Sequence, residues 1–390
     1  MEKKVLLEGI GEALPVFGES PEVRLRSTLS KLGDSFNTIE VSDPSEAEGA
    51  SVLILRKDAV YEPLTLRKLL TMETGVVRDD AGEVLAIALS NATAEAIEAS
   101  RVCMRGDTSN DQLKEIQLSE LGPSYNYSLR KTEPPFAIVV TDPVRRERAE
   151  RRIYASTYKG VTDLVTKYVW PEPAFHLTRW FLRFGIHPNW VTLLGAVLMV
   201  MALLLFWEGL FAAGLVCGWI MALLDTVDGK MARVGGTASK FGEILDHGID
   251  LVHPPFWYLA WLYGLERVGH AVPNGWTEPI LFTIFGTYIV VRLFEGYFIK
   301  RFGFHIHVWR PFDSRFREVV SRRNPNLILL TMGTIAGRPD WGLYALVIWQ
   351  CVAVFVHLIQ ILHAEIARAR SRGPRSWLET DAEPTTHMPA

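Results

Sequence analysis

Long apolar segments dominate the chain from residue 189 to residue 366 and limit how this part can fold. About 20 apolar residues in a helix cross the hydrocarbon core of a bilayer, where unpaired backbone groups find no partner. Six such segments are predicted, at 189–208, 210–231, 244–265, 278–299, 325–337 and 341–363. The fifth is short for a span and needs thin or tilted surroundings. We therefore expect an all-α membrane domain of six transmembrane helices.

The connections between these segments alternate in charge, which predicts their orientation. Seven basic residues lie between the fourth and fifth segments, whereas the turns after the first, third and fifth segments carry few cations. The seven are Lys300, Arg301, Arg310, Arg315, Arg317, Arg322 and Arg323. Cytoplasmic connections of membrane proteins are rich in lysine and arginine. The sequence thus predicts a multi-pass protein of the cytoplasmic (inner) membrane, with both termini and the connection after the second segment in the cytoplasm.

The first 150 residues have a different composition and alternate strand-like with helix-like stretches. Strands are predicted at 52–55, 77–78, 84–89 and 137–140, and helices at 22–32, 63–72 and 93–102. This alternation is typical of an α/β domain. The N-terminus lacks the uninterrupted apolar stretch of a signal peptide, so residues 1–150 are expected to form a soluble cytoplasmic domain.

Residues 151–187 are predicted to be a linker that ends in an amphipathic helix. Between Pro173 and Gly185, Arg179 and Arg183 accompany apolar residues, namely Phe175, Leu177, Trp180, Phe181, Leu182 and Phe184. Such a helix lies on the inner leaflet with its basic residues toward anionic headgroups, although a soluble packing helix is an alternative. The membrane domain is then expected at 188–370, with a disordered tail at 371–390.

Four acidic residues flank the connection between the second and third apolar segments. Helical spacing places one set of residues on one helix face and a second set on the face of the next helix. The sets are Asp225, Asp228, Gly229 and Ala232, and Gly242, Asp246 and Asp250. Carboxylates about 4 Å apart repel each other by ~4 kcal/mol, so the cluster must protonate, separate or bind cations. Oxygen ligands favour Mg²⁺, Mn²⁺ or Ca²⁺ over zinc.

Two alternatives to a metal site fit these acids less well. A solvated acidic helix end is the usual fate of a lone acidic pair, but here the acids alternate with small residues inside apolar sequence. A cation-coupled transporter also places carboxylates in the membrane. The acids lie at the ends of two adjacent segments instead of marking a path through the bilayer, which favours a ligand site at the cytoplasmic face.

The pattern Asp-x2-Asp-Gly-x2-Ala-Arg-x8-Gly-x3-Asp-x3-Asp resembles the signature of the CDP-alcohol phosphotransferases. All its fixed positions are present, namely Asp225, Asp228, Gly229, Ala232, Arg233, Gly242, Asp246 and Asp250. The resemblance covers roughly residues 150–370. It implies an enzyme that transfers a phosphoryl-linked group from a CDP-activated donor to an alcohol and releases CMP, in phospholipid or polyol-phosphate biosynthesis. CDP-diacylglycerol, a soluble CDP-polyol and a CDP-aminoalcohol all remain open as donors.

The resemblance also implies roles for particular residues. Two Mg²⁺ or Mn²⁺ ions would be bound by Asp225, Asp228, Asp246 and Asp250, and Asp250 would also be the catalytic base. The CDP-binding residues would be Gly229, Ala232, Arg233, Gly242 and Thr192, with Arg233 either a diphosphate contact or a helix-end anchor. The expected partners are the CDP-linked donor, the alcohol acceptor, membrane lipids and a second copy of the chain, but no nucleic acid.

Arg322 and Arg323 stand immediately before the short fifth segment. Their position is compatible with the ordinary excess of cations in cytoplasmic connections. Paired guanidinium groups also bind phosphate through charge-assisted hydrogen bonds. We therefore expect Arg322 and Arg323 to bind a phosphate of the acceptor or an anionic lipid headgroup.

The first domain resembles the nucleotidyltransferase-like domains that are fused to some members of this family. The resemblance rests on the run from Leu53 to Pro63 and the helix that follows. An active domain would need a glycine-rich, arginine-containing phosphate loop after the first strand, and the segment from Gly9 to Gly11 supplies no basic residue. An inert structural or regulatory domain is expected, and a bifunctional enzyme with an active cytidylyltransferase is the alternative.

Few other residues offer metal or redox chemistry. His305 and His307 have i, i+2 spacing, but a metal site there would need two more ligands. Cys103, Cys217 and Cys351 are too few and too scattered for a disulfide framework and are expected to be free thiols.

Overall fold

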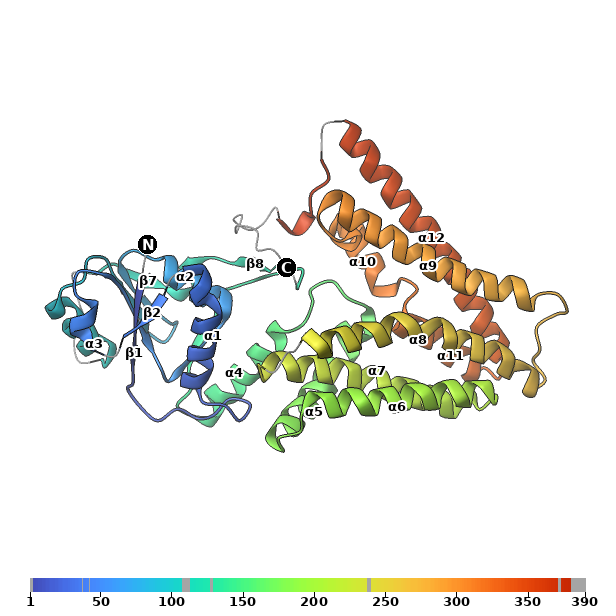
Figure 1. Ribbon diagram of the computed structural model, residues 1–390, viewed down its shortest axis with the longest axis horizontal. Helices are drawn as coiled ribbons and strands as arrows, with labels where there is room; N and C mark the ends of the chain where they lie inside the picture. Colours follow the sequence, from blue (N-terminus) through green and yellow to red (C-terminus); the bar gives the residue numbers. More distant parts are fainter. Residues whose placement is uncertain are drawn as a thin grey trace. The chain divides into compact units, whose positions relative to one another are not determined.

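The computed structural model describes residues 3–36, 38–41, 43–106, 113–126, 129–236, 240–370 and 373–379, without the side chains of residues 34, 35, 44, 240–247 and 379. The chain divides into two compact units (Figure 1). The first comprises Met1–Asn126 and Thr132–Ser156, and the second comprises Tyr127–Lys131 and Thr157–Asp381. Each unit is described by itself.

The first unit is built on a six-stranded mixed sheet with the strand order β2-β1-β3-β6-β5-β7. The strands are β1 (Lys3–Glu8), β2 (Thr38–Glu40), β3 (Ser51–Arg56), β5 (Gly75–Arg78), β6 (Val84–Leu89) and β7 (Glu115–Gln117). Strand β1 is parallel to β2 and β3, β6 is antiparallel to β3 and β5, and β5 is parallel to β7. This confirms the α/β domain expected from the alternation in the sequence.

Helices and short strands complete this unit. The helices are α1 (Pro21–Phe36), α2 (Pro63–Thr71), α3 (Ala94–Met104) and α4 (Pro143–Ser156), with one-turn helices at Pro44–Ala47 and Leu118–Leu121. Strands β4 (Ala59–Tyr61) and β10 (Ala137–Val139) form a separate antiparallel pair. Two further short strands are β8 (Ser124–Asn126) and β9 (Lys131–Glu133).

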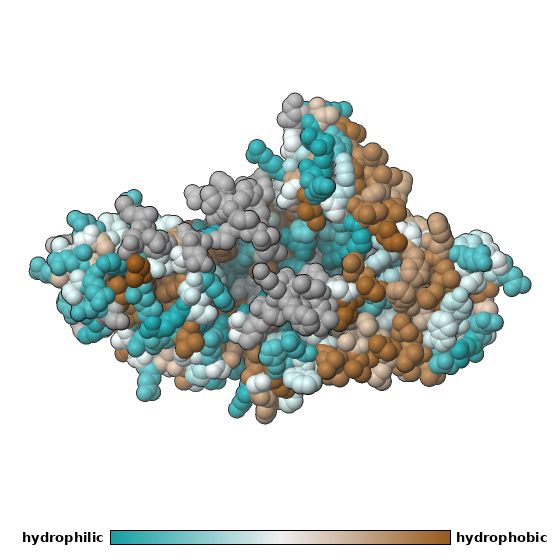
Figure 2. All heavy atoms as spheres, viewed as in Figure 1, coloured by the Kyte–Doolittle hydropathy of each residue, from teal (hydrophilic) through white to brown (hydrophobic). Residues whose placement is uncertain are grey.

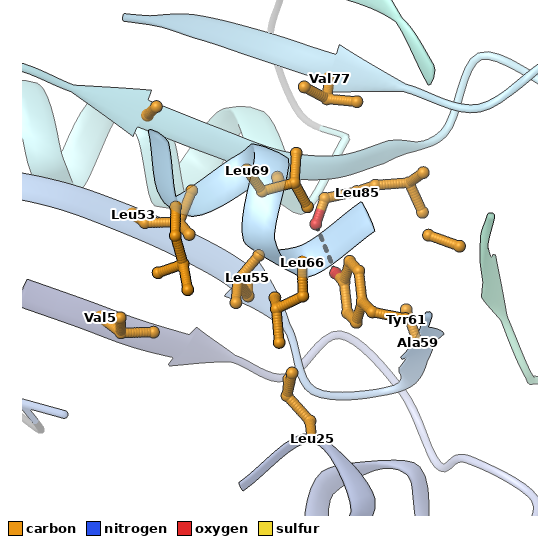
Figure 3. Close-up of a cluster of buried hydrophobic side chains, with 14 of the residues drawn as sticks. Val5, Leu25, Leu53, Leu55, Ala59, Tyr61, Leu66, Leu69, Val77 and Leu85 are labelled. Atoms are coloured by element: carbon orange, nitrogen blue, oxygen red, sulfur yellow. Dashed lines mark hydrogen bonds between the residues drawn. The ribbon is translucent and has the colours of Figure 1, made fainter. Parts of the chain in front are cut away.

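Alternating side chains of β3 form a core on each face of the sheet. Leu53 and Leu55 point to one face and pack in a cluster with Leu66 and Leu69 of α2 (Figure 3). The hydroxyl of Tyr61 in this cluster donates a hydrogen bond of 2.6 Å to the Leu85 carbonyl, so that its polar atom is paired inside the core. The other face of β3 packs in a second cluster that includes α3 residues. A strand buried on both faces reads as a continuous apolar run, which explains the Val-Leu-Ile-Leu sequence.

The second unit consists of helices. They are α5 (Pro171–Arg183), α6 (Pro188–Trp207), α7 (Phe211–Val234), α8 (Lys240–Arg267), α9 (Thr277–Phe302), α10 (Pro311–Val319), α11 (Arg323–Ile335) and α12 (Pro339–Ala369), with one-turn helices η3 (Val165–Val169), η4 (Ile306–Val308) and η5 (Trp377–Glu379). Helix α5 coincides with the predicted amphipathic helix. The predicted membrane segments coincide with α6, α7, α8, α9, α11 and α12.

Four helices in the described part of the chain, α6, α7, α9 and α12, are long and apolar enough to cross a membrane. Helix α11 has 13 residues. Exposed apolar side chains cover the outside of these helices, for example Leu193, Val197, Met201 and Leu204 of α6 (Figure 2). A surface of this composition fits contact with lipid.

Glycine allows the closest contacts between these helices. A Cβ on Gly264 of α8 would lie 1.9 Å from the carbonyl oxygen of Phe206, and one on Gly333 of α11 would lie 2.6 Å from the backbone nitrogen of Gly342 in α12. Small residues at such positions let membrane helices pack backbone to backbone. The buried indole of Trp261 donates a hydrogen bond of 3.0 Å to the Pro339 carbonyl, which ties α8 to the start of α12.

The segment after α12 differs from the expected disordered tail. Within residues 371–390, Gly373–Glu379 is described, and it packs back onto the connection between α9 and α10. Ser376 is 1% exposed and donates a hydrogen bond of 2.8 Å to the Val308 carbonyl. The indole of Trp377 donates a hydrogen bond of 2.9 Å to the Ser314 hydroxyl. These two hydrogen bonds hold the segment in place, and composition alone does not reveal them.

Candidate active site

Three of the four predicted acids come together where α7 and α8 approach each other. Asp228 is 5% exposed, and its carboxylate accepts hydrogen bonds of 2.5 Å from the Thr192 hydroxyl and from the backbone N–H of Gly229. Thr192 belongs to α6, so the hydroxyl joins a third helix to the acid cluster. These two donors fix the orientation of the Asp228 carboxylate.

Arg323 bridges the other two acids. Its guanidinium donates hydrogen bonds of 2.6 Å to Asp225 and 2.5 Å to Asp250. Arg323 begins α11, so the short helix supplies the cation that holds α7 and α8 together at this point. Charge-assisted hydrogen bonds of this kind are roughly twice as strong as neutral ones. The sequence suggested an acceptor or lipid phosphate as the partner of Arg323, whereas in the structure its partners are the two acids.

The remaining residues of the sequence pattern lie on α8 and near the end of α7. The helical backbone of α8 includes Gly242 and Asp246, but their side-chain surroundings lie outside the described residues. Gly229 lines a cavity beside the acids, and the atom nearest to a Cβ placed there would be an Arg233 nitrogen at 3.8 Å. Ala232 is half-buried and is not among the described residues that line this cavity.

A polar cavity of about 420 Å³ opens beside the acid cluster. Its described lining includes three carboxylates, Asp163, Asp225 and Asp250, and seven basic side chains. The basic residues are Lys159, Lys230, Arg233, Arg292, Arg317, Arg322 and Arg323. Basic side chains thus outnumber carboxylates by four among these residues. Such an excess in a partly enclosed site attracts anionic ligands.

Two basic side chains near the end of α7 hold the linker segment at Thr157 beside the cavity. Lys230 and Arg233 donate hydrogen bonds of 2.8 Å and 3.1 Å to the same carbonyl oxygen, that of Thr157. The Lys230 ammonium also lies 3.3 Å from the ring centroid of Tyr158, within cation–π range. Arg233 therefore contacts the linker, and its side chain also lines the cavity.

The linker contributes a buried acid, Asp163, and a lysine, Lys159, to the cavity lining. Neither residue was predicted from the sequence. Asp163 accepts hydrogen bonds from the Asn324 amide at 2.9 Å and from the Thr166 hydroxyl at 2.8 Å. Burial by itself raises the pKa of Asp163, but the Arg317 guanidinium and these hydrogen bonds lower it overall. Burial lowers the pKa of Lys159 to about 8, and neighbouring arginines, Arg317 among them, contribute in the same direction. No local pattern marks these residues, because the linker reaches the cavity only through the fold.

The low pKa of Lys159 predicts a pH-dependent affinity for anions. Below pH 8 the ammonium is charged and attracts a phosphate, and above it the charge is lost. We expect the KM or Kd of a phosphate-bearing ligand to rise between about pH 7 and about pH 9. Lys159→Arg should keep a low, pH-independent value, because arginine stays charged. Lys159→Met should show a high value throughout, and an unchanged pH profile in Lys159→Met would contradict this assignment.

The acid cluster fits a divalent cation. Asp225, Asp228 and Asp250 carry three carboxylates, Arg323 contributes one positive charge, and two negative charges remain. All the ligand atoms offered are oxygens, which suits Mg²⁺ or Mn²⁺ and does not favour zinc. Asp246 lies one helical turn before Asp250 in α8, and its side chain is outside the described residues.

Residues 185–312 match the family model of CDP-alcohol phosphatidyltransferase, and this segment contains Thr192 and all four acids. This segment of the chain is thus similar to CDP-alcohol phosphatidyltransferases.

Named relatives agree with the family match. The phosphatidylinositol phosphate synthase of Mycobacterium bovis is 40% identical over 77 residues, which are 20% of this chain and 36% of that protein. The archaetidylinositol phosphate synthase of Pyrococcus horikoshii is 34% identical over 120 residues, 30% of this chain and 59% of that protein. The chain therefore spans about a third of the length of the mycobacterial relative.

A crystal structure of Mycobacterium tuberculosis phosphatidylinositol phosphate synthase with CDP-DAG bound is similar at 21% identity and a TM-score of 0.36. The matched region covers 48% of this chain and 92% of the mycobacterial chain.

Proposed function

We propose that this protein transfers a phosphatidyl-type group from a CDP-linked lipid, such as CDP-diacylglycerol, to the hydroxyl of a phosphorylated polyol, and releases CMP. One observation carries the proposal: the acid cluster and a cavity with excess positive charge form a single site. The acids suit a metal ion that holds a diphosphate, and the cations suit a second phosphate on the acceptor. The relatives that synthesise phosphatidylinositol phosphate and archaetidylinositol phosphate support an inositol phosphate as that acceptor.

Asp225 and Asp228 of α7, with Asp246 and Asp250 of α8, would hold two Mg²⁺ or Mn²⁺ ions. When bound, the ions neutralise the diphosphate of the donor and stabilise the charge of the departing CMP. Thr192 and the Gly229 N–H keep the Asp228 carboxylate in one orientation. Gly229 lines the cavity, and the cytidine would lie against it.

Asp250 would act as the base for the acceptor hydroxyl. The hydroxyl oxygen forms a bond to the phosphorus of the donor, the bond from that phosphorus to the CMP oxygen breaks, and the hydroxyl proton passes to a carboxylate oxygen of Asp250. In the structure one of these oxygens accepts a hydrogen bond from Arg323. This hydrogen bond would orient the carboxylate before the acceptor enters.

Arg322, Arg317 and Lys159 would bind the acceptor phosphate. All three line the cavity, and Arg317 is 8% exposed although it carries a charge. Burial lowers the pKa of Arg317. The pKa is lowered further because the neighbouring Arg322 guanidinium repels the charged form of Arg317. A phosphate dianion would relieve this repulsion and provide a hydrogen-bond acceptor for each group.

The purified chain in lipid nanodiscs tests the proposal directly. With Mg²⁺ or Mn²⁺, CDP-diacylglycerol and inositol phosphate, we expect CMP release that EDTA abolishes and that excess metal restores. Inositol without its phosphate should serve poorly at the same concentration. Equal use of both alcohols would remove the phosphate assignment. No CMP from any combination of CDP-linked donor and alcohol would contradict the proposed activity.

The placement in the membrane follows the same proposal. We place six spans, α6, α7, α8, α9, α11 and α12, in the inner membrane, with the termini and the acid cluster on the cytoplasmic side. The excess of cations between α9 and α11 supports this orientation, and a homodimer is the expected assembly. An interfacial position is proposed for helix α5. Trp180 of this helix and Phe184, which follows it, are both exposed beside basic residues.

The first unit is proposed to be catalytically inert. Glu8, at the end of β1, accepts hydrogen bonds from Arg101 at 2.7 Å and from Arg105 at 2.6 Å. Asp58, which follows β3, is 1% exposed, and its two oxygens accept hydrogen bonds from Arg56 at 2.9 Å and 2.6 Å. Both carboxylates near the ends of the central strands are thus engaged within the unit.

We therefore expect the full chain, supplied with CTP, Mg²⁺ and an alcohol phosphate, to release no pyrophosphate above the background without enzyme. The same preparation should release CMP when it is supplied with a CDP-linked donor, which controls for folding. Pyrophosphate release that depends on the alcohol phosphate would instead identify a bifunctional enzyme.

A further inference from the structure

A buried carboxylate behind the cavity wall holds two of the cavity arginines. The Glu295 side chain on α9 is 13% exposed. One carboxylate oxygen accepts a hydrogen bond from Arg322, and the other accepts one of 3.2 Å from Arg292. Both arginines line the cavity, whereas Glu295 is not among its described lining residues. Glu295 therefore contacts the site through the two arginines.

Two buried histidines approach this carboxylate from other elements. His307 of η4 is 2% exposed and lies with its Nε2 3.1 Å from the Glu295 oxygen that binds Arg322. His357 of α12 is fully buried, with its Nε2 3.8 Å from the same oxygen. The two rings are tilted against each other with centroids 5.5 Å apart. Because Glu295 accepts at this oxygen, the His307 Nε2 is the protonated nitrogen and donates.

The same three side chains also have the composition of a metal site. Their ligand atoms all lie within 4.8 Å of one another, and two imidazoles with one carboxylate are zinc ligands in many proteins. The local charge argues against a metal ion. Arg322 and Arg292 both bind Glu295, so a divalent cation would add two positive charges to a carboxylate that two guanidiniums already share. Buried charges without counter-charges are strongly unfavourable.

We propose that His307 is a positioning residue for the acceptor site: its hydrogen bond holds the Glu295 carboxylate, which in turn holds Arg322 at the cavity wall. This inference rests on the proposed function, because Arg322 is assigned there to the acceptor phosphate. Without an anchor, Arg322 would turn away from the neighbouring cations Arg317 and Lys159, which line the same cavity. The Glu295 carboxylate holds the Arg322 guanidinium in one orientation before the acceptor binds. This lowers the entropic cost of binding.

A pair of uncharged substitutions tests the hydrogen bond without changing the electrostatic field. His307→Leu removes the donor and leaves a buried acceptor oxygen with one partner fewer, a change that is worth about tenfold in a binding constant. We expect the KM for inositol phosphate to rise about tenfold in His307→Leu, while kcat and the KM for CDP-diacylglycerol stay within about twofold. His307→Gln, which keeps an N–H donor, should restore the acceptor KM. His363→Leu, at an exposed position of α12, is the matched control.

The route through Arg322 is tested by a double-mutant cycle. In an Arg322→Ala background, His307→Leu should raise the acceptor KM no further, because the group that it positions is gone. A further increase of about tenfold in that background would overturn the proposal, as would equal changes in the two substrates. Stoichiometric zinc in the Mg²⁺-saturated wild-type protein that is lost in His307→Leu would also overturn it, in favour of the metal site.

The failure of the proposed function can be told apart from the failure of this inference. If the wild-type protein releases no CMP with any alcohol, the function is wrong. The same variants can then be compared by calorimetry with inorganic phosphate as the ligand. Wild type and His307→Gln should bind it alike, and His307→Leu about tenfold more weakly. Equal affinity in all three would overturn the positioning role.

Discussion

Asp228→Asn is expected to lower turnover by roughly a thousandfold, because it removes one charged ligand from the metal clamp and so loses about 4 kcal/mol of transition-state stabilisation. The asparagine oxygen can still accept the hydrogen bond of the Thr192 hydroxyl, so the packing between α6 and α7 is retained. CMP release at saturating Mn²⁺ and both substrates is the measurement. Asp225→Asn and Asp246→Asn should behave in the same way.

Glu365→Gln provides a charge-matched control for this prediction. Glu365 lies on α12 and pairs with Arg301 at 3.0 Å, away from the described lining of the cavity. It should retain turnover close to that of the wild type. Asp250→Asn should also be inactive but should bind the CDP-linked donor better than the other variants, if its main task is to accept the proton. Wild-type turnover in Asp225→Asn or Asp228→Asn would refute the metal assignment.

Arg322→Ala is expected to raise the KM for the phosphorylated acceptor by between about tenfold and a hundredfold, because a charge-assisted hydrogen bond to phosphate is lost. The KM for the CDP-linked donor should stay within about twofold, since the metal ions hold the donor diphosphate. Initial rates over a grid of both substrate concentrations separate the two constants.

Arg315→Ala controls for the general loss of positive charge from this connection, because Arg315 is exposed on α10 and is not among the described cavity residues. It should leave both KM values unchanged. Arg323→Ala should behave differently from Arg322→Ala. Since Arg323 pairs with Asp225 and Asp250, its loss should impair turnover with both substrates. An Arg322→Ala variant that affects donor and acceptor equally would indicate a defect in folding instead of acceptor binding.

Local patterns in the sequence were sufficient for the helices and for the helix face that Asp225 and Asp228 share. A helix is set by residues three and four positions apart, so Asp225 and Asp228 could be assigned to one face of α7 without knowledge of the fold. The apolar segments located α6 to α9, α11 and α12 for a similar reason, since a lipid environment requires long continuous runs. The strands β3 and β6 followed from their apolar, β-branched composition.

The partners of the basic residues depended on tertiary structure. From the sequence, Arg322 and Arg323 looked like an equivalent pair of phosphate ligands, but consecutive residues at the start of α11 point to different neighbours: Glu295 and the acid cluster. Which acid a guanidinium meets depends on how α9 and α8 pack against α11. No spacing within the sequence encodes that contact.

By itself, then, the sequence determined which segments become helices and which carboxylates share a helix face, because both depend on short-range periodicity. Only the tertiary structure decided that Lys159 from the linker lines the cavity, that Arg323 bridges the acids, and that His307 reaches Glu295. These contacts join residues from separate elements and are made by single side chains, so they leave no repeating pattern along the chain. Their positions follow from the packing of the helices, which depends on the whole core at once.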